Sequence, residues 1–239
     1  MAAIPEVQMV WGTRQAGVMI RARLFAIAIV AAAAAGAVAM YIVINPVPAF
    51  DVTIERDIQA TSWGPFAIAF PAFSWIGDAK GAVLDALVLI AVLIWNRRAW
   101  ILAVAGYMTG VWYVALSHLF IRARPTTAQV LQVTDHPSAS SFPSGHTIFI
   151  VTVTSVLMLC LGQRFLPRWA IPIGWGVVAL VVFDGAISRI YTGAHWPTDV
   201  LAGLLIAAAW LCFVLSIRWI SDRALPPNGV DRPTAHPAS

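Results

Sequence analysis

The sequence is poor in charged residues. Only 11% of its 239 residues are Asp, Glu, Lys or Arg, whereas 60% are hydrophobic and the mean hydropathy is +0.80. Soluble domains carry about 25% charged residues. The composition therefore excludes an ordinary soluble domain and indicates an integral membrane protein.

The chain also has little cysteine and no basic stripe. Its two cysteines, Cys160 and Cys212, lie in apolar runs, where a free thiol behaves as a small hydrophobe. Their spacing suggests neither a disulfide framework nor a metal site. The net charge of +4 is dispersed between hydrophobic runs, which argues against nucleic-acid binding.

Apolar runs predict an all-α fold, a polytopic membrane bundle of about six transmembrane helices. The first run, residues 24–44, has no charge and is long enough to cross the hydrocarbon core as a helix. Arg21 and Arg23 before it also resemble the start of a signal peptide, but the run exceeds a typical signal core and favours an anchor. The other expected spans are 81–95, 99–121, 147–161, 170–187 and 200–217.

Two prolines, Pro65 and Pro71, interrupt the apolar segment 63–76. Because proline breaks a helix interior, this segment is predicted to be a short interfacial or re-entrant piece on the outer face, not a seventh span.

Three parts of the chain are expected. Residues 1–23 form a cytoplasmic N-terminal segment, 24–221 the membrane-embedded domain, and 222–239 a disordered tail that lacks an apolar period.

Basic residues are unevenly divided between the loops. With six spans and a cytoplasmic N-terminus, ten of the fifteen would lie on the cytoplasmic side, as the positive-inside rule requires. The five that would lie outside are Arg56, Lys80, Arg122, Arg124 and Arg189. Three of these belong to polar islands in the sequence, and arginines at such places have a reason other than topology to be there.

The polar islands are residues 122–125 (RARP), 141–147 (SFPSGHT) and 188–199 (SRIYTGAHWPTD). Together they hold three arginines, two histidines and an aspartate, the groups needed to grip a phosphate, attack it and protonate what leaves. We expect them to form one site on the side away from the cytoplasm.

In the third island His195 and Asp199 are four residues apart, and Pro197 is favourable at a first helical position. The two side chains are expected to share a helix face. A carboxylate on one ring nitrogen would leave the other free to attack, so His195 is the predicted nucleophile and Asp199 its partner. The alternative is that the pair forms only a polar helix cap.

In the second island Ser144, Gly145 and His146 stand directly before an apolar run. Free backbone N–H groups at a helix start attract anions, Ser144 is the expected cap, and Gly145 allows the backbone to approach a phosphate. His146 is the predicted general acid and base.

The arginines supply positive charge. Arg122 and Arg124 lie two apart in a segment that Pro125 favours as extended, so both can point the same way, and Arg189 adds a third guanidinium. Such groups bind phosphate oxygens in bidentate fashion. The alternative is that they reach for lipid headgroups.

These motifs resemble those of the type 2 phosphatidic acid phosphatases, between residues 122 and 199. The resemblance implies that His195 is the nucleophile, Asp199 its partner and His146 the general acid. It places Arg124, Arg189, Ser144 and Gly145 around the phosphate, with no metal or cofactor. The family's first motif opens with a lysine seven residues before the Arg-Pro pair, where this chain has Ser117.

The missing lysine removes a phosphate contact worth about 1.5–3 kcal/mol. His118 and Arg122 are four residues apart, and on one helix face they would partly compensate.

The expected function is hydrolysis of a lipid phosphomonoester or pyrophosphate, such as undecaprenyl pyrophosphate or phosphatidic acid, through a phosphohistidine. The same residues would serve a lipid phosphotransferase, and the arginines alone would serve a protein that binds or transports lipid phosphates. The resemblance implies a bacterial inner membrane, with lipid phosphates and membrane lipids as partners. The oligomeric state is left open.

Overall fold

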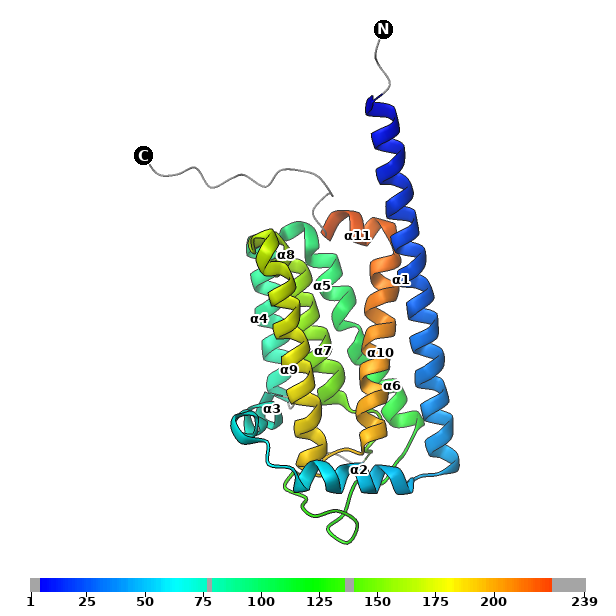
Figure 1. The fold of residues 1–239 in the computed structure, drawn as a ribbon, viewed down its shortest axis with the longest axis vertical. Helices are drawn as coiled ribbons and strands as arrows, with labels where there is room; N and C mark the ends of the chain where they lie inside the picture. The colour runs from blue at the N-terminus through cyan, green and yellow to red at the C-terminus, as the bar shows by residue number, and fades with distance from the viewer. Residues whose placement is uncertain (1–4, 77–78, 136–139, 225–239) are drawn as a thin grey trace, which may run out of the picture.

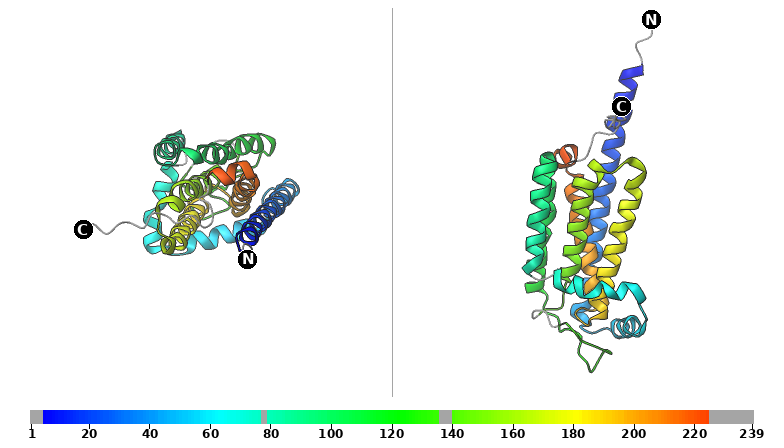
Figure 2. Two further views of the ribbon diagram at one scale, coloured as in Figure 1. Left: turned by 90° about the horizontal axis from the view of Figure 1, so that it is seen from above. Right: turned by 90° about the vertical axis from the view of Figure 1, so that its left-hand side faces the viewer.

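The computed structural model describes residues 5–76, 79–135 and 140–224. Every regular element in these ranges is a helix, as the composition predicts. The long helices run side by side and α2 lies across the end of the bundle opposite the N-terminus (Figures 1 and 2). The elements are α1 (Pro5–Ile44), α2 (Ala49–Ala60), η1 (Gly64–Ile68), α3 (Phe70–Ile76), α4 (Ala79–Trp95), η2 (Arg97–Ala99), α5 (Trp100–Tyr107), α6 (Thr109–Leu119), α7 (Gly145–Leu157), η3 (Met158–Gly162), α8 (Gln163–Phe165), η4 (Arg168–Ala170), α9 (Ile171–Tyr191), α10 (Pro197–Ser216) and α11 (Arg218–Ala224).

Five helical segments in the described ranges are long and apolar enough to cross a membrane: Gly17–Ile44, Arg97–Leu119, Gly145–Phe165, Arg168–Tyr191 and Pro197–Ser216. The second expected span, 81–95, corresponds to α4, whose 17 residues stand at the short limit for a span. The predicted membrane bundle is therefore confirmed, with five helices long enough to span the membrane and α4 as a shorter apolar helix.

The first span belongs to the bundle. Four alanines of α1, Ala28, Ala31, Ala35 and Ala39, are buried, and small side chains of this kind let two helix backbones approach closely within a membrane. Ala35 and Ala39, together with Ile42, share a buried cluster with Ala202 and Ile206 of α10. This packing supports the interpretation of the run as an anchor.

The expected domain boundaries do not coincide with breaks between helices. Helix α1 begins at Pro5 and continues through the boundary expected at residue 24. Helix α11 continues to Ala224, past the expected end of the membrane domain at residue 221. The remainder of the expected tail, 225–239, lies outside the described residues.

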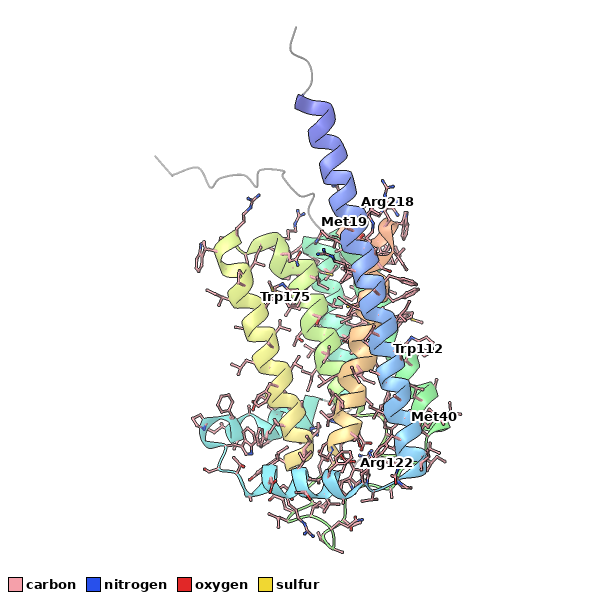
Figure 3. All side chains as sticks on the ribbon, turned by 45° about the vertical axis from the view of Figure 1, so that its right-hand side comes forward. Met19, Met40, Trp112, Arg122, Trp175 and Arg218 are labelled. Carbon is pink, nitrogen blue, oxygen red and sulfur yellow. The ribbon has the colours of Figure 1, made fainter. Side chains whose placement is uncertain are left out.

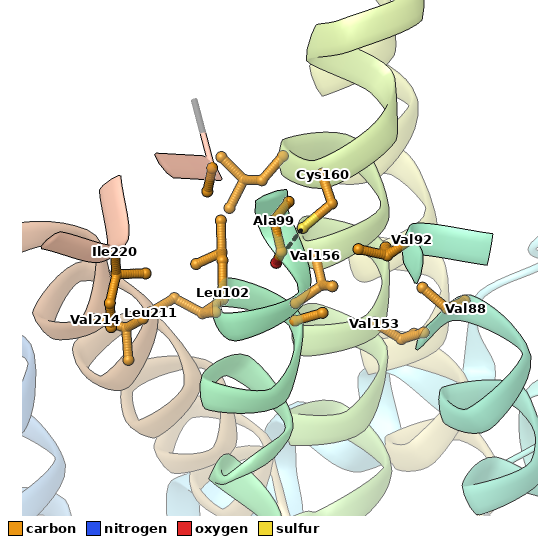
Figure 4. Close-up of a cluster of buried hydrophobic side chains, with 13 residues drawn as sticks. Val88, Val92, Ala99, Leu102, Val153, Val156, Cys160, Leu211, Val214 and Ile220 are labelled. Atoms are coloured by element: carbon orange, nitrogen blue, oxygen red, sulfur yellow. Dashed lines mark hydrogen bonds between the residues drawn. The ribbon is translucent and has the colours of Figure 1, made fainter. Parts of the chain in front are cut away.

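The core that holds the helices together lies towards the end of the bundle marked by α11 (Figure 4). Val92, Leu102, Val156 and Val214, from four different helices, are all buried there. Near this core α7 passes into a π-helical turn, η3, which alters the regular pattern of backbone hydrogen bonds. The Asn96 amide donates to the Cys160 carbonyl in this turn at 2.7 Å.

The opposite end carries the short helices. The segment expected to be interfacial forms η1 and α3, and α3 packs against α9. Helix α2, which the apolar pattern did not predict, has its polar face turned inwards: Asp51, Glu55 and Gln59 are buried, whereas Phe50 and Ile54 are exposed.

Candidate active site

The three polar islands meet at the end of the bundle that α2 crosses (Figure 1). The first follows α6, the second leads into α7, and the third joins α9 to α10. Backbone contacts join them, since the Ser141 N–H donates to the Arg122 carbonyl at 2.9 Å and the Ser144 N–H to the Asp199 carbonyl at 3.1 Å. The structure therefore brings the three islands together at one end of the bundle.

His195 lies in the short turn between α9 and α10. The turn depends on Gly193, whose φ of +70° is in the left-handed region that favours glycine. A Cβ there would also lie 2.5 Å from the Gln132 carbonyl oxygen, so the turn fits closely against the loop after the first island. The backbone N–H of His195 donates to the Arg189 carbonyl at 3.2 Å and closes the turn.

The partner of the His195 imidazole differs from the prediction. Its Nδ1 lies 2.7 Å from the backbone carbonyl oxygen of Ser141 and 4.0 Å from the nearest Asp199 oxygen. Because a carbonyl only accepts hydrogen bonds, Nδ1 carries the proton and Nε2 keeps its lone pair. The backbone thus fixes the tautomer, a role that the spacing had given to Asp199.

The expected shared helix face fails for a geometric reason. Helix α10 starts at Pro197, so His195 precedes the helix and the four-residue rule does not apply to it. Asp199 is the third helical residue, and its carboxylate accepts from the Trp196 N–H at 2.9 Å and from the Ser141 hydroxyl. Asp199 therefore holds the backbone N–H that follows His195, binds the side chain of Ser141 and caps the helix.

Arg124 reaches across the nucleophile candidate. Its guanidinium donates to the carbonyls of Ala194 at 2.5 Å and Ser140 at 2.6 Å, and one nitrogen lies 3.5 Å from His195 Nε2. Burial, with the positive charge of Arg124 as the next cause, lowers the pKa of His195 well below its ordinary value. The imidazole is therefore neutral at pH 7, the form that has a nucleophilic lone pair.

His146 lies in the first turn of α7, with its ring centroid 6.4 Å from that of His195. Ser144 caps this helix as predicted: its hydroxyl accepts from the Thr147 N–H at 3.4 Å and from the Thr147 hydroxyl at 2.9 Å. Gly145 is needed because the Tyr113 ring packs on it, with a ring carbon 2.7 Å from where a Cβ would stand.

Arg122 does not point with Arg124. Its three side-chain nitrogens donate to the Pro46 carbonyl, to Thr198, and to the carboxylates of Asp51 and Asp199. The side chain is 2% exposed, so the prediction that Arg122 binds phosphate directly is wrong. The reason is that two buried carboxylates compete for its guanidinium.

Arg189 is fully buried near the end of α9. Its guanidinium donates to Asp135 at 2.9 Å, to the Ser188 hydroxyl at 2.8 Å and to the Ser74 hydroxyl at 2.5 Å. The third arginine thus belongs to the same end of the bundle, where it connects α9 with α3 and with the loop after the first island.

The suggested compensation by His118 is also wrong. Helix α6 ends at Leu119, so Arg122 lies beyond it in an extended stretch and shares no helix face with His118, which is exposed. Ser117, at the family's lysine position, donates to the Val114 carbonyl of its own helix at 3.0 Å.

A cavity of about 580 Å³ is bounded by residues of α4, α5, α6 and α7 and by the polar islands. His146, His195 and Arg124 line it together with Asp85 of α4 and Tyr113 of α6. Both candidate catalytic histidines therefore face one space that extends between two membrane helices.

Two contributors were missed by sequence reasoning. Ser141 holds His195 through its carbonyl and Asp199 through its hydroxyl, and Asp51 of α2 binds Arg122. A backbone carbonyl leaves no sequence signal. Asp51 and Glu55 did leave one, because acidic residues four apart share a helix face.

The fold and this end of the bundle define a polytopic membrane protein with two histidines and an arginine around a single cavity. The PAP2 superfamily model matches residues 98–223, more than half of the chain and the part that holds all three islands. The chain belongs to the PAP2 superfamily.

Two curated proteins that are similar in sequence are named as phosphatases of polyprenyl compounds. The chain is 31% identical, over 54% of its length and 67% of the relative's, to a decaprenylphosphoryl-5-phosphoribose phosphatase of Mycobacterium tuberculosis. It is 30% identical to the undecaprenyl-diphosphatase BcrC of Bacillus subtilis, over 52% of this chain and 63% of that one. Among the curated relatives it matches, the chain spans from about a third to about two thirds of their length.

A crystal structure of a transmembrane PAP2-type phosphatidylglycerolphosphate phosphatase from Bacillus subtilis has a similar fold. The TM-score is 0.62, the identity is 19%, and the match covers 79% of this chain and 93% of that one. At this identity the likeness concerns the fold alone.

Proposed function

We propose that this chain is an integral membrane phosphatase that hydrolyses a phosphomonoester or pyrophosphate of a lipid through a phosphohistidine. The observation that carries the proposal is the state of His195: its Nδ1 is bound to a carbonyl, which leaves a lone pair on Nε2, and the side chain lines a cavity shared with His146 and Arg124.

The reaction has two steps. In the first, Nε2 of His195 attacks phosphorus, the bond from phosphorus to the leaving oxygen breaks, and His146 gives that oxygen a proton. In the second, His146 takes a proton from water, whose oxygen attacks phosphorus, and the bond to Nε2 breaks. Inorganic phosphate leaves and both histidines return to their starting forms.

The remaining site residues stabilise charge and hold geometry in this proposal. Arg124, which lines the cavity, stabilises the charge on the transferring phosphoryl group. The expected phosphate contact of Arg189 is not carried over, because Arg189 is as buried as Arg122 and its guanidinium is bound to Asp135, Ser74 and Ser188. Gly145 and the N–H groups at the start of α7 approach the phosphate, with Ser144 keeping that turn in place. Asp199 fixes the backbone around His195.

The shape of the cavity supports a lipid substrate. It is lined by Asp85 of α4, Gly110 and Val114 of α6, and His146 of α7, so a headgroup at the histidines can keep its chain between membrane helices. Two of the relatives are named for polyprenyl substrates, which favours undecaprenyl pyrophosphate or a similar polyprenyl phosphate here. The arginine distribution favours a site on the side away from the cytoplasm, which would be the periplasmic side if the membrane is a bacterial inner membrane.

The test is phosphate release by purified protein in detergent with excess EDTA. Undecaprenyl pyrophosphate, phosphatidic acid and phosphatidylglycerophosphate are offered to the wild type, His195→Ala and, as a matched control, His118→Ala. Release by the wild type and His118→Ala but not by His195→Ala is expected. Equal release by all three proteins would refute the role of His195, and a phosphorylated lipid acceptor in place of free phosphate would indicate a transferase.

A further inference from the structure

We propose that Asp51 of α2 is a positioning residue for this reaction: through Thr198 and Arg122 it fixes the first turn of α10 and thereby the orientation of His195. The inference rests on the proposed function, because it gives Asp51 a part in the same chemistry. Asp51 lies outside the three polar islands and outside residues 98–223 matched by the family model.

Asp51 binds the start of α10 directly. One of its carboxylate oxygens accepts from the Thr198 backbone N–H at 3.0 Å, and the other accepts from the Thr198 hydroxyl at 2.6 Å. The N-cap residue of α10, Trp196, supplies no side-chain cap to this N–H. A carboxylate from a different helix therefore satisfies a backbone donor at a helix N-terminus, where negative charge is stabilising.

Arg122 links Asp51 to the turn that carries His195. Its guanidinium donates to Asp51 at 2.7 Å and to Asp199 at 2.5 Å, so one fork joins the two carboxylates (Figure 3 shows Arg122 at this end of the bundle). Asp199 in turn accepts from the Trp196 N–H and from the Ser141 hydroxyl. The Ser141 carbonyl is the group that holds His195 Nδ1.

The charged side chains of this network are buried, so each of them depends on its partners in the network. The side chains of Asp51 and Asp199 are 0% exposed and that of Arg122 is 2% exposed. Buried charges of this kind persist only when they are paired and hydrogen-bonded. Loss of the Asp51 charge would leave Arg122 free to pull Asp199 out of its position, and with it the Trp196 N–H and Ser141, the two groups that flank His195.

Glu55 provides a matched control on the same helix. It lies one turn after Asp51 and is equally buried, but neither of its carboxyl oxygens has a hydrogen-bond partner within the part of the chain that the structure describes. A change from Glu55 to the neutral Gln removes no contact of the network.

The experiment measures kcat and KM for phosphate release from undecaprenyl pyrophosphate by the full chain in detergent. Asp51→Asn is expected to lower kcat on the order of 10–100-fold with KM unchanged, since the group that moves is the nucleophile. Glu55→Gln is expected to keep the wild-type kcat. A wild-type kcat for Asp51→Asn, or equal losses in both variants, would overturn the proposal.

Arg122→Lys separates positioning from charge. Lysine keeps the positive charge but lacks the fork that joins two carboxylates, so its kcat is expected to fall as far as that of Arg122→Gln. Full activity of Arg122→Lys would show that only charge is needed and would contradict the proposal.

Two further measurements keep the test decisive. If Asp51→Asn does not fold, Thr198→Val removes the bridging hydroxyl without touching either charge; a lowered kcat supports the network and an unchanged kcat refutes it. If the wild type itself releases no phosphate, the proposed function fails, and amide hydrogen exchange over residues 196–200 then tests the network by itself. Faster exchange in Asp51→Asn than in Glu55→Gln supports the network, and equal exchange in the two variants refutes it.

Discussion

Replacement of Glu55 by Gln should make the protein more stable at alkaline pH. Burial, reinforced by the nearby charges of Asp51 and Asp199 and opposed by that of Arg122, raises the pKa of Glu55 from an ordinary 4.5 to about 9. The carboxyl group is therefore neutral in the folded protein over a range in which it is ionised in the unfolded chain.

The sign of the pH effect follows from proton binding. Between pH 4.5 and about 9 the folded protein holds one proton on Glu55 that the unfolded chain has lost, so stability falls as pH rises through this window. The limiting slope is about 1.4 kcal/mol per pH unit for one group. For a chain of this size that corresponds to roughly 3–6 °C in Tm per pH unit.

The assay is thermal unfolding of the wild type and Glu55→Gln in the same detergent at pH 5.5, 6.5, 7.5 and 8.5. The difference in Tm in favour of the variant should grow with pH by about 3–6 °C per unit. Asp57→Asn, on the same helix but on its exposed face, serves as the control and should follow the wild type. Parallel curves for Glu55→Gln and the wild type would refute the reasoning, because they would show an ionised Glu55 in the folded protein.

Two other substitutions test the turn that carries His195. Gly193→Ala should lower the free energy of unfolding by about 1–2 kcal/mol from the left-handed φ alone, and by more because the new Cβ would meet backbone atoms. The change is measured as a lower Tm, with Gly176→Ala as the control because a Cβ at that position meets no other atom. An unchanged Tm for Gly193→Ala would contradict the structure. Arg124→Lys should lower kcat/KM on the order of 10²–10³-fold, because a single amine cannot donate to the two carbonyls and to a phosphate at the same time. Arg56→Lys, at the same end of the bundle, is the control. Full activity of Arg124→Lys would contradict the expectation.

The helix bundle and the position of the three polar islands at one end of it were predictable, because both follow from the requirements of the lipid bilayer. Apolar runs of sufficient length must cross the hydrocarbon as helices. Among the six spans expected from the sequence, the islands stand after the third, before the fourth and between the fifth and sixth, so alternation of the spans brings all of them to one side of the membrane. No side-chain detail is needed for either conclusion.

Helix α2 was not predictable by the same rule. Its apolar residues Phe50 and Ile54 face outwards and its polar stripe faces the protein, the reverse of the pattern by which amphipathic helices are recognised. The stripe begins with Asp51 and ends with Gln59, whose amide oxygen accepts from the Leu131 N–H at 2.8 Å. Its partners are loops and arginines far away in the sequence, so only the tertiary structure explains why it is buried.

His195 Nδ1 is bound by the Ser141 carbonyl and not, as predicted, by the Asp199 carboxylate, and this difference has a chemical consequence. A carboxylate against Nδ1 would stabilise a protonated imidazole, whereas the Ser141 carbonyl orients the ring with a weaker pull on the proton. Asp199 is instead bound to Arg122, and Arg124 stands on the other side of the imidazole. Positive charge thus faces the site while His195 stays neutral, which is the combination that a nucleophile needs in order to attack an anionic phosphate.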